Sequence, residues 1–183
     1  MSIAAKLRRA PLRATTGAFI LNSGLSKFEA DDETAKTLHS LASGTYPFLA
    51  KVPPKVFVKA LAAGEVALGG ALLLPIIPAG VAGLGLTGFS SGLLGIYWKT
   101  PGMHSEGLPR PTMQGTPIAK DFWMFGVGTS LVVDALLTES RATGIEARAN
   151  ARAAVKAEAK AARRAAKRSA RAARRHAAHV LPS

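Results

Sequence analysis

Residues 55–77 read KVFVKALAAGEVALGGALLLPII, and residues 79–98 read AGVAGLGLTGFSSGLLGIYW. Each stretch holds about 20 residues of mostly apolar character, which is what an α-helix needs to cross the hydrocarbon core of a bilayer. A buried helix of a soluble protein usually has a shorter apolar run, of about 10–14 residues. The two stretches are joined by a tight turn at Pro75 and Pro78. In a soluble protein, both would therefore need one large core to cover them. They therefore predict two membrane helices, over 56–77 and 79–98.

Two further stretches complete a predicted all-α fold, a four-helix transmembrane bundle. Residues 122–138, FWMFGVGTSLVVDALLT, predict a helix over 120–138. A weaker apolar run, Ala14–Leu25, follows a basic segment and predicts a first helix over 8–27. A charged segment before a short apolar run is also typical of a cleaved signal peptide, and that alternative stays open.

The charge of the chain is concentrated at its C-terminal end. The 183 residues carry 24 Lys+Arg and 11 Asp+Glu, a net charge of +13, and no Cys. The absence of Cys excludes disulfides, thiolate metal sites and thiol redox chemistry within this chain. Residues 1–138 have a net charge of +4, and residues 139–183 one of +9. We therefore divide the chain into a transmembrane domain, 1–138, and a basic tail, 139–183.

The tail is rich in Ala, which favours a helix. Its eleven basic residues from Arg148 onward recur at steps of three and four, within an arc of about 200° on a helical wheel. They are Arg148, Arg152, Lys156, Lys160, Arg163, Arg164, Lys167, Arg168, Arg171, Arg174 and Arg175. Because the opposite face is nearly all Ala, the tail should bind by charge and not by insertion into lipid. Anionic lipid headgroups are the first partner we expect, nucleic acid is a weaker alternative, and a solvated or disordered tail is the third reading.

Topology follows from the placement of basic residues. Lys and Arg favour the cytoplasmic side, and the N-terminal cluster Lys6–Arg13 sets the orientation. Four helices then place both termini in the cytoplasm. Tyr46, Tyr97, Trp98 and Trp123 all fall on the outer side of this layout, as expected of aromatic rings at a headgroup boundary.

Glu65 and Asp134 are the candidate site residues within the predicted spans. By helical rise they lie about 15 Å and 18 Å from the same membrane face, so they could be neighbours. Carboxylates are costly in hydrocarbon and face a partner, a cavity or the bundle interior. They could relay protons or bind a polar headgroup or a quinone carbonyl. The structural alternative is that they fix helix packing, or that Asp134 lies at the inner interface.

Two other patterns in the sequence bear on possible sites. Gly88 and Gly92 have GxxxG spacing, which is typical of close helix packing, either within the bundle or against another subunit. The four His residues are scattered without further ligands at metal spacing, so no metal site is predicted. No catalytic motif is present, and we do not expect an enzyme with its own reaction.

The membrane core resembles the DoxX family of small bacterial membrane proteins. The resemblance is carried by residues 16–28 (TGAFILNSGLSKF), 64–70 (GEVALGG) and 119–121 (AKD), and it excludes the tail. It implies a four-helix bundle in the bacterial plasma membrane and an association with membrane redox complexes, including quinone-linked oxidation of sulfur compounds.

From this resemblance we expect an accessory or structural subunit of such a complex, in contact with other membrane subunits and without a cofactor of its own. One alternative is a quinone-binding oxidoreductase subunit. The other is a membrane tether that recruits nucleic acid or anionic lipid through the tail.

Overall fold

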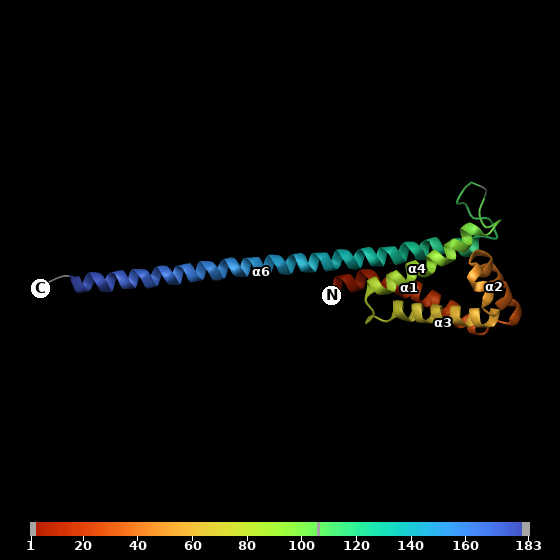
Figure 1. Cartoon of the computed structure of the whole chain (residues 1–183), viewed down its shortest axis with the longest axis horizontal. Helices are drawn as coiled ribbons and strands as arrows, with labels where there is room; N and C mark the ends of the chain where they lie inside the picture. Colours follow the sequence, from red (N-terminus) through yellow and green to blue (C-terminus); the bar gives the residue numbers. More distant parts are fainter. Residues whose placement is uncertain (1–2, 106, 181–183) are drawn as a thin grey trace. The chain divides into compact units, whose positions relative to one another are not determined.

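A computed structural model of the chain is α-helical. It describes residues 3–105 and 107–180, without the side chains of residues 159 and 161–180. The elements in chain order are α1 (Ile3–Phe28), α2 (Asp32–Thr45), the 3₁₀ helix η1 (Pro47–Lys51), α3 (Pro54–Leu73), α4 (Ala79–Lys99), α5 (Thr116–Ala119) and α6 (Asp121–Val180) (Figure 1). The chain divides into two compact units, Met1–Leu137 and Thr138–Ser183.

Three helical stretches are long and apolar enough to cross a membrane: Pro54–Leu73, Ala79–Lys99 and Thr116–Glu158. Their outer faces expose large apolar side chains, including Val56, Leu73, Val81, Leu84, Val133 and Leu136. An apolar surface of this kind is consistent with a membrane protein. The three strong predicted spans are therefore confirmed as helices of suitable length and composition. Among the described residues α1 is not one of them, because even its most apolar part contains polar residues such as Asn22 and Ser23 between Arg13 and Lys27.

Three predicted helix boundaries are corrected. α1 begins at Ile3 and not at residue 8, because the Ala, Leu, Lys and Arg residues before residue 10 have high helix propensity. α3 ends at Leu73 and not at residue 77, because Leu74 adopts an extended backbone before Pro75. A residue before proline is sterically pushed out of the helical region. α6 does not stop at residue 138 but continues to Val180, since the Ala-rich sequence keeps a high helix propensity.

Asp31 caps the N-terminus of α2. Its Oδ1 accepts a hydrogen bond of 2.8 Å from the backbone N–H of Thr34. This hydrogen bond stabilises the carboxylate and lowers the pKa of Asp31 from its ordinary value. The cap fixes the point at which the chain turns from α1 into α2.

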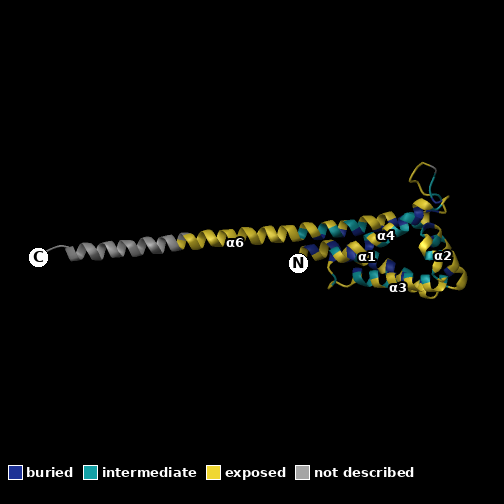
Figure 2. Ribbon diagram, in the orientation of Figure 1, coloured by how far each residue is buried: buried dark blue, intermediate teal, exposed yellow. Residues whose placement is uncertain are grey.

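A hydrophobic core lies within the unit Met1–Leu137, and four helices contribute to it. Its buried members are Ile20 of α1, Leu72 of α3, Ala82 and Leu86 of α4, and Met124 and Leu131 of α6. Buried and exposed residues alternate along these helices (Figure 2), as expected of helices that each turn one face to a shared core. α2 lies at one end of this unit and contacts α3 and α4 (Figure 1).

Glycines allow two pairs of these helices to approach closely. A Cβ added at Gly69 of α3 would lie 2.6 Å from the backbone nitrogen of Leu21 in α1. A Cβ at Gly83 of α4 would lie 2.8 Å from the carbonyl oxygen of Gly128 in α6. Small residues permit such contacts, which supply packing in lipid where no hydrophobic force drives helix pairing.

The predicted packing pair, Gly88 and Gly92, does not take part in these contacts. A Cβ at either position would meet no atom within 4 Å. The GxxxG spacing marks a face of α4 with small residues, but in this fold that part of the face lines a cavity instead of meeting a helix.

Candidate functional site

A cavity of about 580 Å³ lies within the unit Met1–Leu137. Residues of α1, α2, α3, α4 and the start of α6 line it. Most of its wall is apolar and includes Phe19, Leu38, Leu41, Phe57, Leu61, Phe89, Leu93, Ile96 and Met124. The volume falls in the range typical of small-molecule sites, about 300–1,000 Å³. Gly88 and Gly92 also line the cavity and leave space in it, because neither has a side chain to fill that space.

Lys27 and Glu65 form an ion pair on the cavity wall. The Nζ atom of Lys27 donates to Oε2 of Glu65 at 2.8 Å and to the hydroxyl of Ser23 at 2.7 Å. Ser23 lies one helical turn before Lys27, so both side chains share a face of α1. The side chain of Glu65 is only 6% exposed. A buried carboxylate needs such a partner, and Lys27 supplies it from the neighbouring helix.

Asp121 and Lys120 bring a second pair of charges to the same cavity. Asp121 is the first residue of α6 and its side chain is 2% exposed. Its Oδ1 accepts no hydrogen bond from the described residues, and the nearest cation, Nζ of Lys120, lies 3.5 Å away. A buried acceptor without a hydrogen bond is costly in a folded protein, so a donor from a ligand or from water would stabilise it.

Four charged groups, which we call the polar cluster, provide the apolar cavity with both hydrogen-bond donors and hydrogen-bond acceptors. They are Lys27, Glu65, Lys120 and Asp121. The two ammonium groups can donate to a carbonyl oxygen. The two carboxylates can accept from a hydroxyl group or exchange a proton with it. The cavity therefore suits a molecule with an apolar body and a polar head that carries oxygen.

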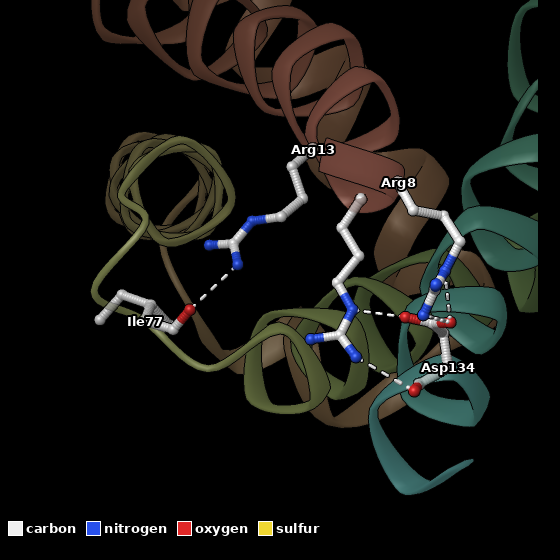
Figure 3. A network of polar contacts seen from close by, with 5 residues as sticks. Arg8, Arg13, Ile77 and Asp134 are labelled. Carbon is white, nitrogen blue, oxygen red and sulfur yellow. Dashed lines mark hydrogen bonds and ion pairs between the residues drawn. The ribbon is translucent and has the colours of Figure 1, made fainter. Parts of the chain in front are cut away.

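The structure does not bring the predicted pair, Glu65 and Asp134, together. Asp134 accepts hydrogen bonds from Nε and Nη2 of Arg8 at 2.9 and 2.6 Å, and from Nε of Arg9 at 2.5 Å (Figure 3). Arg9 and Lys27 both lie on α1 and are about 27 Å apart by helical rise. The two carboxylates thus belong to separate ion pairs, because α1 offers cations at both of its ends.

Arg13 has a different partner, the C-terminal end of α3. Its guanidinium donates to the carbonyl oxygens of Ala71, Leu72, Leu74 and Ile77 at 2.7–3.0 Å. Figure 3 shows the bond to Ile77. The last carbonyl groups of a helix lack partners within the helix. Arg13 supplies those partners and ties α1 to the turn between α3 and α4.

The tail can be followed only in part. Arg148, Arg152, Lys156 and Lys160 are exposed on α6, four residues apart, so they share one face. The side chains of Arg163, Arg164, Lys167, Arg168, Arg171, Arg174 and Arg175 lie outside the described residues.

Comparison of the chain with protein-family models, with curated proteins and with solved structures finds no match. The resemblance to the DoxX family therefore stays a prediction from the sequence.

Proposed function

We propose that this chain is an integral membrane protein whose cavity binds a small amphiphilic molecule of the quinone class. The observation that carries the proposal is the placement of the polar cluster at an apolar cavity, with Oδ1 of Asp121 buried and lacking a hydrogen bond. The resemblance to the DoxX family supports the same conclusion, since that family is associated with quinone-linked redox complexes. On this proposal the chain is the quinone-binding membrane subunit of such a complex, and the partner subunits perform the oxidation.

Quinone chemistry fits the groups that line the cavity. A quinone carries carbonyl oxygens that accept hydrogen bonds, and the ammonium groups of Lys27 and Lys120 are donors. Its reduced form carries hydroxyl groups, and Oδ1 of Asp121 is an acceptor without a hydrogen bond. The apolar wall suits an isoprenoid chain. When bound, a quinone would supply two-electron redox chemistry, whereas the residues of this chain bind it and hold the protons that it exchanges.

We propose further that α1 is a fourth membrane helix, so that α1, α3, α4 and the start of α6 form a bundle with both termini in the cytoplasm. The uncharged stretch of α1 between Arg13 and Lys27 spans only about 20 Å by helical rise, which is less than the hydrocarbon thickness of about 30 Å. Both of its flanking charges have internal partners, on α3 carbonyl groups and on Glu65. Polar groups paired inside a bundle can lie at membrane depth.

Single cysteines test this topology, since the chain has none of its own. In sealed right-side-out vesicles, we expect a membrane-impermeant maleimide to label Glu29→Cys from outside and Ala4→Cys only after the vesicles are opened. Both positions are exposed in the structure. Labelling of both cysteines from the same side would mean that α1 lies on the membrane surface.

The quinone site is tested by filling the cavity. Gly88 lines it and a side chain added there meets open space, so Gly88→Leu should occupy the cavity without disturbing the fold. Gly64 is the matched control, because it is exposed, also meets open space and does not line the cavity. Titration of the purified full-length protein with decylubiquinone should show saturable binding to the wild type and to Gly64→Leu. We expect Gly88→Leu to bind about tenfold more weakly or worse, a loss of at least about 1.4 kcal/mol.

A charge variant tests the role of the polar cluster in the same titration. Asp121→Asn keeps the size of the side chain and removes its charge, so it should weaken binding of the reduced, hydroxyl-bearing form more than that of the oxidised form.

Equal affinity for wild type and Gly88→Leu would exclude the cavity as the quinone site. Absence of saturable binding to the wild type would reject the proposed function.

A further inference from the structure

A second hollow, which we call the arginine groove, has a volume of about 430 Å³ and lies at the opposite end of α1 from Lys27. It runs between the N-terminal turns of α1 and the C-terminal end of α3. Its apolar wall is formed by Ile3, Leu7, Ala10, Leu73 and Pro75, and its basic wall by Lys6, Arg9 and Arg13. No carboxylate lines this groove among the described residues.

Among the described residues, three cations line the arginine groove and no carboxylate does. Arg8 and Arg9 share the single carboxylate of Asp134. Arg13 donates to backbone carbonyl groups and forms no ion pair with a carboxylate in the described structure. Lys6 is exposed, and its ammonium group adds a further positive charge. Of the three cations that line the groove, Arg9 is 3% exposed and paired with Asp134, whereas Lys6 and Arg13 form no ion pair with a carboxylate among the described residues.

We propose that the arginine groove is a binding site for one anionic phospholipid. Its phosphate would lie against Lys6 within the field of Arg9 and Arg13, and an acyl chain would lie along the apolar wall. An anionic phospholipid matches both the apolar wall and the basic wall of the groove. A soluble phosphate would leave the apolar wall empty, and a zwitterionic lipid would leave the positive charge of the basic wall uncompensated. The site requires only that the chain lies in a membrane, and it is independent of what the cavity at Lys27 binds.

Filling the arginine groove tests the proposal in the full-length protein. Ala10 is exposed and lines the groove, so Ala10→Phe blocks the acyl-chain position and keeps every charge, including the whole basic tail. Ala18→Phe on the same helix is the matched control, since Ala18 is exposed and lies outside the groove. Detergent-solubilised protein is titrated with phosphatidylglycerol or with phosphatidylcholine of the same acyl chains, and bound lipids are counted by native mass spectrometry.

We expect wild type and Ala18→Phe to retain one phosphatidylglycerol more tightly than phosphatidylcholine, and Ala10→Phe to lose this preference. Lys6→Gln should weaken the preference about fivefold, since one cation near an anionic lipid contributes about 1 kcal/mol. Soluble glycerol phosphate should not displace the lipid. Equal retention by Ala10→Phe and Ala18→Phe would overturn the proposal, and so would displacement by glycerol phosphate. Because Gly88 and Ala10 line different hollows, failure here leaves the quinone test unaffected.

Discussion

Replacing Asp134 by Ala should lower the free energy of unfolding by about 3–5 kcal/mol, because it leaves a buried guanidinium without its counter-ion. Arg9 is 3% exposed, and its Nε and Nη2 atoms donate to the carboxylate and to the backbone carbonyl of Asp134. The Asp134 carbonyl would still accept one of these bonds in the variant, but the negative charge would be gone. Thermal and denaturant unfolding of the full-length protein in detergent micelles, followed by circular dichroism, would measure the loss.

Arg8 provides the control for this prediction. It donates to the same carboxylate, but its side chain is 53% exposed. Arg8→Gln should therefore cost no more than about 1 kcal/mol, as is usual for exposed ion pairs. The double variant Arg9→Met/Asp134→Leu should recover much of the stability lost in Asp134→Ala, since apolar residues can replace a buried ion pair at little cost. Equal losses for Arg8→Gln and Asp134→Ala would show that burial of Arg9 does not determine the energetics.

The sequence predicted the apolar helices well because their signal is local. A run of about 20 apolar residues identifies a membrane-crossing helix without knowledge of its neighbours. α3, α4 and the start of α6 lie close to the predicted positions, and the misplaced end of α3 reflects a single residue before Pro75.

The candidate site was predicted only in part because its pairings are not local. Glu65 is a candidate because of its cost in hydrocarbon, but its partner Lys27 is not among the predicted site residues. Lys27 was nonetheless a detectable candidate, because an intramembrane carboxylate needs a cation and Lys27 ends the neighbouring predicted helix. Asp121 appeared only as part of a family motif, and no local pattern indicates that its Oδ1 is buried without a hydrogen bond.

The ion pair between Arg9 and Asp134 also cannot be predicted from local sequence, because its partners are even farther apart in the chain. Arg9 is 125 residues from Asp134 in the sequence, and only the packing of α1 near α6 brings the two together. The spacing of Gly88 and Gly92 likewise indicates a face of small residues, but it cannot distinguish a helix contact from a cavity wall. In each case the type of residue was informative, and the identity of its neighbour required the tertiary structure.

Gly69 and Gly70 should respond in opposite ways to the same substitution, although they are adjacent in α3. Each Gly→Ala change gains up to about 1 kcal/mol of helix propensity. A Cβ at Gly70 meets no atom within 4 Å, so Gly70→Ala should keep that gain. A Cβ at Gly69 would lie 2.6 Å from the backbone nitrogen of Leu21 and 2.8 Å from its Cα, which are atoms that no side-chain rotation can move.

In Gly69→Ala, α1 must therefore shift away from α3, and overpacking of this kind costs about 1–3 kcal/mol. Because the propensity gain is common to both variants, the difference between their unfolding free energies isolates the contact between α1 and α3. The shift would also strain the bonds that Arg13 and Lys27 make to α3, so Gly69→Ala should lose stability while Gly70→Ala gains a little. Unfolding of both variants in the same micelles measures this difference. Equal stabilities would mean that α1 and α3 are not packed through Gly69, and the arrangement that places Lys27 beside Glu65 would then have to be revised.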